Sequence, residues 1–260
     1  MIVVKLLGGM GNQLFQRAYG FALESHGFEV AFDRSELIEG THREYSLEEY
    51  FDLQFRDNST NQPLYEKSLR FDSQMLEPPY DRTMVGYWQS EKYFEAQSYS
   101  IRKRFNSHWM FKPLQPYTKS ISTEILKQNS VFIHVRRQDY VGLQHFHGMP
   151  GLDYYAGAVD TIRDQHINPK FFVFSDDTDW CKEHFPSDFR IVEGTDKHED
   201  LRLMASCKHA IVANSSFSWW GAWIGDDQAG RTVIAPRRWF AVEKDKADDT
   251  DIVPERWLRI

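Results

Sequence analysis

A run of basic residues, HVRRQD at positions 134–139, follows an apolar segment and offers the strongest chemistry in the sequence. Arginine forms two parallel hydrogen bonds with phosphate oxygens and stays charged at any relevant pH. Because side chains alternate along an extended chain, His134 and Arg136 should point to one side and Arg137 to the other. We expect one arginine to contact an anionic ligand and the other to pair internally, with Asp139 as the natural partner. The alternative is a surface ion-pair network.

A second cluster precedes a tryptophan-rich segment and contains Asn214, Ser215, Ser216, Phe217 and Ser218. Small hydroxyl side chains at the start of a helix can cap the helix, and they can also hold a phosphate there. The three tryptophans that follow can stack on sugar or base faces. For at least two of them, packing in the core is the expected role.

A glycine-rich turn, GGMGNQ at residues 8–13, lies between an expected strand and an expected helix. Glycine lets the backbone approach a ligand closely, and a helix N-terminus favours anions. A dinucleotide-binding fingerprint would need a third glycine where Leu14 stands, and the only nearby acid is Asp33. This weakens a dehydrogenase hypothesis and leaves a plain strand-to-helix turn as the alternative.

These clusters must be positioned by two successive α/β patterns. Hydrophobic periodicity predicts strands at 2–7, 28–32, 131–133, 170–174, 210–213 and 232–235, and helices at 12–26, 91–104, 153–165 and 199–207. Polar residues follow three of the expected strands, with Asp176 and Asp177 closing the one at 170–174. Open α/β sheets bind ligands at the carboxyl ends of their strands, so the sequence predicts a site there.

Two prolines between Lys112 and Pro116 mark the expected crossing between an N-terminal domain, residues 1–116, and a C-terminal domain, residues 117–260. No internal repeat or low-complexity segment interrupts either part.

The composition narrows the function. A formal net charge of -7 argues against a nucleic-acid partner. Cys181 and Cys207 form no zinc or redox motif and are expected to be buried thiols. His145 and His147 lack a third ligand, so a metal pair is disfavoured. No apolar run approaches the ~20 residues that span a bilayer, which predicts a cytoplasmic protein, or one peripheral at the inner face of the membrane.

Taken together, four segments resemble the α-1,2-fucosyltransferases of glycosyltransferase family 11. They run in family order across nearly the whole chain, at residues 8–16, 89–94, 134–140 and 200–223. The resemblance implies an α/β fold of GT-B type, with two Rossmann-like domains facing a cleft. It also implies an acceptor-side N-terminal domain, a C-terminal domain that binds GDP-fucose, inversion at the anomeric carbon and no metal or other cofactor.

The resemblance also implies residue roles. His134 lies against the nucleoside, Arg136 contacts the β-phosphate, and Asn12 faces the transferring sugar. Asp200, sixteen positions before the phosphate-binding Ser216, reads the guanine edge. Arg136 and Asn12 are therefore the expected catalytic residues. The expected donor-binding residues are His134, Arg137, Asp139, Asp200, Asn214, Ser215, Ser216, Phe217 and Ser218.

The expected activity is transfer of L-fucose to a galactose-type hydroxyl in an α-1,2 linkage, for surface glycan synthesis. The partners would be GDP-fucose and a galactose-containing oligosaccharide or lipid-linked glycan. A glutamate that some relatives carry after the arginine motif falls on Gln144 here, so no general base is assigned. The alternatives are another nucleotide sugar, another linkage, or an inactive sugar-binding protein.

Overall fold

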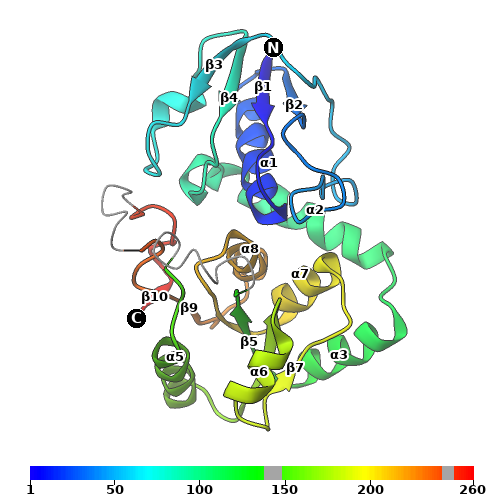
Figure 1. Cartoon of the computed structure of the whole chain (residues 1–260), viewed down its shortest axis with the longest axis vertical. Helices are drawn as coiled ribbons and strands as arrows, with labels where there is room; N and C mark the ends of the chain where they lie inside the picture. The colour runs from blue at the N-terminus through cyan, green and yellow to red at the C-terminus, as the bar shows by residue number, and fades with distance from the viewer. Residues whose placement is uncertain (138–147, 242–248) are drawn as a thin grey trace. The chain divides into compact units, whose positions relative to one another are not determined.

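The computed structural model of the chain describes residues 1–137, 148–241 and 249–260. The chain forms two compact units (Figure 1). Unit 1 contains Met1–Phe111 and the return segment at residues 249–254, and unit 2 begins at Lys112 and includes Glu255–Ile260. Each unit has its own sheet, and every strand pairing within the two sheets is parallel. Two α/β units of this kind confirm the expected fold class, the GT-B type.

Unit 1 is built on a four-stranded sheet with the order β2-β1-β4-β3. Its strands are β1 (Ile2–Lys5), β2 (Val30–Asp33), β3 (Gln62–Tyr65) and β4 (Arg82–Val85). Its α-helices are α1 (Met10–Ser25) and α2 (Ser98–Phe111), and short 3-10 turns lie at Ser73–Leu76, Glu91–Tyr93 and Glu95–Gln97. Helix α1 has apolar residues at helical spacing, including Leu14, Ala18 and Leu23, and most of its other residues are buried as well.

Unit 2 is built on a six-stranded sheet with the order β10-β9-β8-β5-β6-β7. Its strands are β5 (Asn129–Val135), β6 (Pro169–Ser175), β7 (Arg190–Ile191), β8 (His209–Ile211), β9 (Val233–Ala235) and β10 (Leu258–Arg259). Its helices are α3 (Pro116–Lys127), α5 (Leu152–Gln165), α6 (Thr178–His184), α7 (Lys197–Ser206) and α8 (Ser216–Ile224).

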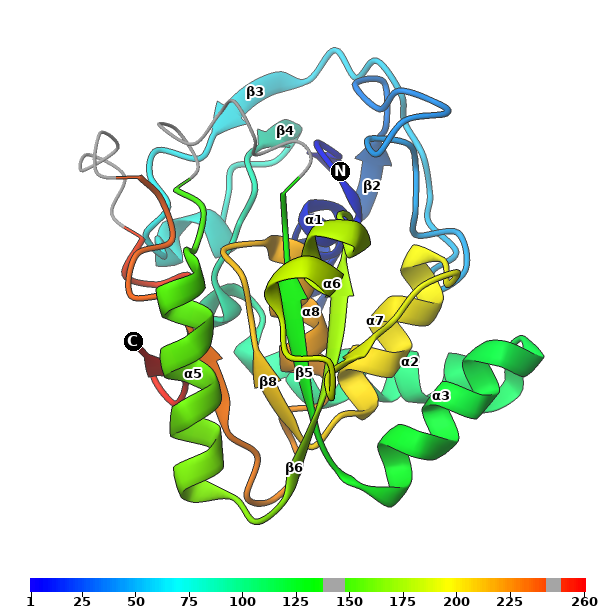
Figure 2. The same cartoon turned by 60° about the horizontal axis from the view of Figure 1, so that its bottom comes forward.

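The sheet of unit 2 is covered by helices on both faces (Figure 2). Helices α5 and α6 pack on one face through a core that includes Val131, Ile133 and Val173. Helices α3, α7 and α8 lie on the other face. Burial on both faces explains why β5 and β6 read as nearly continuous apolar runs.

Three features differ from the sequence prediction. The helix expected at 91–104 is two 3-10 turns followed by α2, because buried Phe94 leaves the helical conformation to pack on Phe15. Strands β3 and β4 arise in a segment without readable periodicity. Residues 249–254, which were expected in the second domain, join unit 1, where Asp251 pairs with Lys92 at 2.6 Å.

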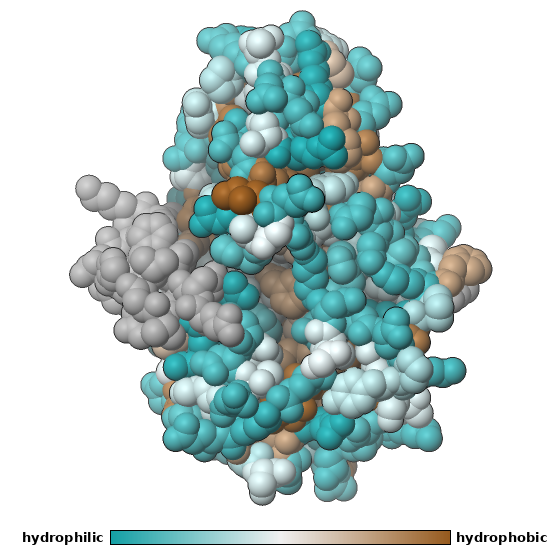
Figure 3. Space-filling view, turned by 45° about the vertical axis from the view of Figure 1, so that its right-hand side comes forward, coloured by the Kyte–Doolittle hydropathy of each residue, from teal (hydrophilic) through white to brown (hydrophobic). Residues whose placement is uncertain are grey.

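The face of the molecule in Figure 3 is mainly hydrophilic, with smaller hydrophobic areas between the polar residues. The most exposed large hydrophobic side chains, such as Tyr80, Phe111 and Ile167, belong to different segments. Within the described residues, no helix has both the length and the apolarity needed to cross a bilayer.

Candidate functional site

The polar clusters of unit 2 meet where the strand order of its sheet reverses. Strand β5 pairs with β6 on one side and with β8 on the other. From β5 the chain continues to β6 and β7 on one side of this strand, and it later returns to form β8 on the other side. In open α/β sheets, such a reversal is where the ligand crevice usually lies, outside the carboxyl ends of the strands, here β5 and β8. Both His134 and the segment that begins at Asn214 lie at this edge.

His134 is a buried, neutral imidazole at the end of β5. Its side chain is 5% exposed, and its ring centroid lies 5.8 Å from that of Phe217. Burial, with a smaller contribution from the charge of Arg136, lowers the pKa of His134 to about 3. The buried Nδ1 atom has no hydrogen-bond partner among the described residues. An unpaired buried nitrogen is costly, and a ligand that supplied a hydrogen bond would remove that cost.

Arg136 follows His134 by two residues, so in an extended chain the two side chains point to the same side. Its Nη1 atom is 3.2 Å from Oδ2 of Asp176, and the side chain is 27% exposed. A guanidinium is a planar fork of five N–H donors, the group that can bind phosphate oxygens with two parallel hydrogen bonds. The expected position of Arg136 at the carboxyl edge of the sheet agrees with the structure.

Arg137 is held by a different set of contacts. Its Nε atom lies 3.1 Å from Oδ2 of Asp177, and its guanidinium lies 4.0 Å from the ring centroid of Trp180. Its backbone N–H donates to Oδ1 of Asp176 at 2.9 Å. The sequence had suggested Asp139 as the internal partner, and that residue lies outside the described residues. These contacts direct Arg137 toward α6 and give it a structural role, and its expected contact with the donor stays a prediction.

Helix α8 brings its N-terminus to the same edge. The N-cap residue is Ser215, whose side chain makes no capping hydrogen bond, and Ser216 begins the helix. Both hydroxyls are therefore candidates for a phosphate contact at a helix N-terminus. Ser218 is fully buried, and its hydroxyl donates to the carbonyls of Ala213 and Ser215 at 3.4 and 3.2 Å. Its hydroxyl therefore supports the turn instead of facing a ligand.

Asn214 has a similar supporting geometry. Its side chain is buried, and its Nδ2 atom donates to the carbonyls of Gly148 and Trp239. The amide therefore ties the turn after β8 to two other loops of unit 2. We assign Asn214 to the shape of the crevice.

Asp200 reaches the same edge from α7. A short connection joins the end of α7 to the start of β8, so the helix and the strand run in opposite directions. The N-terminus of α7 therefore lies at the carboxyl end of β8. Helices α7 and α8 therefore run in the same direction, and they approach so closely that a Cβ on Gly221 would lie 2.9 Å from the Cβ of Met204. Four residues earlier in each helix stand Phe217 and Asp200, which are therefore at the same level.

The carboxyl of Asp200 has a pKa well above the usual value for an aspartate. Burial raises its pKa to about 7, although a hydrogen bond from the hydroxyl of Thr195 at 2.5 Å opposes the rise. Perturbed carboxyls of this kind are common at functional sites. Near neutral pH, this group is poised between an acceptor-only carboxylate and a protonated form.

Asn12 belongs to unit 1, in the first turn of α1. Its Oδ1 atom accepts a hydrogen bond from Nε2 of Gln89 at 2.8 Å. The neighbouring Gln13 is fully buried and binds the backbone of Gly8, Glu44 and Ser46. These contacts fix the backbone of the glycine-rich turn and thereby the position of Asn12. Asp33, the acid nearest to the turn in sequence, accepts hydrogen bonds from loop N–H groups, including that of Ser35 at 2.9 Å.

Sequence reasoning gave no role to Asp176, Asp177 and Trp180. The two acids are visible in the sequence as a polar pair after the expected strand at 170–174, but their contacts with the arginines depend on the parallel register that pairs Val135 with Ser175 in the folded sheet. These acids contact arginine in the structure. No group of three potential metal ligands occurs among the described residues, and His145, His147 and Gln144 lie outside them.

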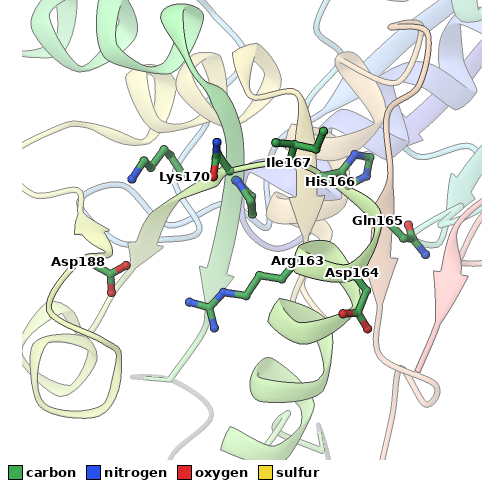
Figure 4. A pocket seen from close by; sticks show the side chains of 9 residues that line it. Arg163, Asp164, Gln165, His166, Ile167, Lys170 and Asp188 are labelled. Carbon is green, nitrogen blue, oxygen red and sulfur yellow. The ribbon is translucent and has the colours of Figure 1, made fainter.

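A pocket of about 710 Å³ lies elsewhere in unit 2 (Figure 4). It is lined by residues such as Arg163, His166, Lys170 and Asp188. These residues surround the start of β6, whereas the polar clusters lie at its carboxyl end. A seven-residue strand separates the two places by roughly 20 Å. The pocket therefore does not contribute to the crevice at β5 and β8.

Comparison with known proteins agrees with this geometry. The profile of the family "Glycosyl transferase family 11" matches residues 47–260. The alpha-1,2-colitosyltransferase of Escherichia coli is 32% identical over 295 aligned positions, which cover 100% of this chain and 99% of that protein. Galactoside alpha-(1,2)-fucosyltransferase 1 of Lagothrix lagotricha is 33% identical over 103 positions, covering 36% of this chain and 28% of that protein.

Among solved structures, the NodZ alpha-1,6-fucosyltransferase soaked with GDP-fucose has a TM-score of 0.48 and 13% identity, covering 86% of this chain and 92% of that one. The family profile spans most of the chain, and the colitosyltransferase aligns with the chain over its full length. The chain therefore belongs to glycosyltransferase family 11.

Proposed function

We propose that this chain transfers L-fucose from GDP-fucose to a galactose-type hydroxyl with inversion at the anomeric carbon, which produces an α-1,2 linkage. The convergence of His134, Arg136 and the N-terminus of α8 at the strand-order reversal of unit 2 carries this proposal. The acceptor would be a galactose-containing oligosaccharide or lipid-linked glycan. The fucosyltransferase among the relatives supports the donor and the linkage.

In this proposal, the nucleoside lies near His134 and Phe217. Guanine presents N1–H and N2–H₂ side by side, and the carboxylate of Asp200 offers two acceptors that match them. His134 stays neutral near pH 7, because its pKa is about 3. It therefore contributes a hydrogen bond and ring contact and cannot serve as a general acid or base.

Departure of GDP leaves negative charge on the β-phosphate, and Arg136 is positioned to stabilise it. The N–H groups at the start of α8 add a second favourable field, because they have no partner within the helix. Preorganised donors of this kind are typically the largest single contribution to catalysis. The acceptor hydroxyl then attacks the opposite face of the fucose. Charge spreads over an oxocarbenium-like transition state, so stabilising the leaving group is the main requirement.

A second donor also deserves a direct test. The relative that aligns over the full chain is a colitosyltransferase, and colitose is the 3-deoxy form of L-fucose. The two donors share the GDP group that the crevice would bind, so they differ only at the sugar. GDP-colitose is therefore the competing donor within the same mechanism.

The decisive experiment measures GDP release from GDP-fucose and from GDP-colitose, with and without galactose-terminated oligosaccharides, followed by linkage mapping of the product. We expect acceptor-dependent release from GDP-fucose and an α-1,2-linked product. A higher kcat/KM for GDP-colitose would replace the donor and keep the mechanism. Binding of GDP without release from either donor would identify an inactive sugar-binding protein instead.

A further inference from the structure

The sheet of unit 1 has its own reversal of strand order. Strand β1 pairs with β2 on one side and with β4 on the other, with Val4 opposite Met84. The loop after β1 leads to Asn12, and the loop after β4 leads to Gln89. The hydrogen bond between these two side chains therefore joins the segments that follow β1 and β4, at the edge where open α/β sheets usually bind ligands.

The loop after β4 holds a strained residue. Trp88 has a φ of +56°, a left-handed conformation that is rare for a bulky side chain. Its side chain is 0% exposed, and its ring stacks on Tyr19 with the centroids 4.2 Å apart. Such strain persists only where the surroundings impose it, and it is concentrated at functional sites.

Glu66 is the residue that imposes this conformation. It directly follows β3, and its Oε2 atom accepts the backbone N–H of Tyr87 at 2.7 Å. Its Oε1 atom accepts the backbone N–H of Trp88 at 3.1 Å. Both oxygens of one carboxylate thus hold two successive peptide groups. The side chain is partly buried, and this burial raises the pKa of Glu66 above its usual value.

The neighbouring residues fit this clamp. A Cβ on Gly86 would lie 2.5 Å from the Cβ of Glu66, so only glycine allows the close approach. The carbonyl of Gly86 accepts Nε2 of Gln16 at 3.0 Å, which anchors the loop to α1. The Gly86–Tyr87 peptide group is therefore held on both sides, by Gln16 at its carbonyl and by Glu66 at its N–H.

The clamp determines where Gln89 points. The N–H of Ser90 donates to the carbonyl of Trp88 at 2.8 Å, so Gln89 is the central residue of a three-residue turn. Its Nε2 atom then donates to Asn12, and this uses the oxygen of the asparagine amide. The bond leaves Nδ2 of Asn12 as the donor available to a ligand.

We propose that Glu66 is a positioning residue, which fixes the Tyr87–Trp88 backbone so that Gln89 holds the amide of Asn12 in one orientation. This inference rests on the proposed function only in one respect, the contact of Asn12 with the transferring sugar. Glu66 itself touches no reacting atom. It acts through Trp88, Gln89 and Asn12 in sequence.

A double-mutant cycle with Glu66→Gln and Gln89→Ala tests the relay. The glutamine would place an NH₂ group against one of the two backbone N–H donors, so the clamp would lose one contact. We expect each single variant to lower kcat on the order of 10²-fold, as a ~1 Å misplacement does, with the KM for GDP-fucose within about twofold. The double variant should be no slower than Gln89→Ala alone. Multiplied losses of kcat would overturn the relay.

Asp33→Asn is the matched control. Asp33 also follows a strand of this sheet and accepts loop N–H groups, but it has no contact with the Asn12 pair. The same carboxylate-to-amide change should lower the melting temperature and leave kcat within about twofold of wild type. An equal loss of kcat in Asp33→Asn would show that general destabilisation explains the effect of Glu66→Gln.

A spectroscopic measurement separates this inference from the proposed function. The side-chain amide signal of Gln89, identified by its loss in Gln89→Ala, should shift in the ¹H–¹⁵N spectrum of Glu66→Gln and stay in place in Asp33→Asn. This measurement needs no substrate. An unmoved signal would refute the relay, whereas a wild-type protein that fails to turn over GDP-fucose would refute only the proposed donor.

Discussion

Replacement of Arg136 by lysine tests the centre of the proposed mechanism. In the structure, one nitrogen of Arg136 is 3.2 Å from Asp176, and the side chain is 27% exposed, so a phosphate at the edge of the sheet can approach the guanidinium while the guanidinium contacts the aspartate. Lysine keeps the charge but loses the planar fork, so it cannot make both contacts with the same geometry. Loss of one well-placed donor costs about 2.7–4 kcal/mol of transition-state stabilisation, which is roughly 10²–10³ in kcat.

The assay is GDP release from GDP-fucose, combined with calorimetric binding of GDP. Affinity for GDP should fall far less than kcat, because the base and the helix N-terminus share the ground-state contacts. An equal loss in both quantities would mean that Arg136 provides uniform binding instead of transition-state stabilisation. An unchanged kcat would refute the assignment.

Arg137→Lys is the matched control, because it makes the same chemical change one residue away. It would lose the cation–π contact with Trp180, worth about 0.5–1 kcal/mol, and the geometry of the Asp177 pair. A loss of about 1 kcal/mol corresponds to roughly 2–4 °C in Tm for a chain of this size. We therefore expect a lower Tm and a small change in kcat. The opposite pattern, with Arg137 controlling turnover and Arg136 controlling melting, would mean that the two faces are exchanged.

Three further outcomes follow from the same structure. The pKa of Asp200 is about 7 because of burial, and only the deprotonated form accepts both guanine donors, so GDP affinity should rise with pH up to about 7 and then level off. Calorimetry across this range checks it, and Asp200→Asn should abolish the dependence. GDP release should persist in EDTA; loss of activity that Mn²⁺ restores would make the acidic pair after β6 a metal site. Gly8→Ala, at a φ of +73° and with the new Cβ 2.5 Å from Nδ2 of Asn12, should lower both stability, by about 1–3 kcal/mol, and turnover. Gly27→Ala, at a φ of +88° in open space, is its control and should lower stability alone, as thermal melting and kinetics would show.

The positions of the polar residues at the ends of β5 and β8 could be predicted, because they depend only on the neighbouring sequence. Each follows a buried apolar run, and alternation places His134 and Arg136 on the same side. The partner of Arg137 could not be found in this way. The sequence suggests Asp139, which lies outside the described residues, but it does not reveal Asp177, which the parallel register of β5 and β6 brings beside Arg137.

The contact of Glu66 with the loop after β4 escaped prediction for a related reason. Strands β3 and β4 are four residues each, and β3 lies at the edge of the sheet with mostly exposed side chains, so neither shows a clear hydrophobic period. Glu66 gains its role only when it meets Trp88, 22 positions later in the chain. A single sequence gives no sign of such a contact, because it depends on the sheet that forms around it.

The chain is acidic overall, but this does not conflict with an anionic donor. The carboxylates of Asp176 and Glu66, beside the two expected ligand-binding edges, already accept hydrogen bonds from the protein. In unit 2, Asp176 follows β6 and accepts the N–H of Arg137 in the loop after the neighbouring β5. In unit 1, Glu66 follows β3 and accepts two N–H groups in the loop after the neighbouring β4. Each carboxylate is thus stabilised by backbone dipoles and fixes the loop beside it. These negative charges order the loops after β5 and β4, and the positive charge of Arg136 lies beside Asp176 at the carboxyl edge of the sheet of unit 2.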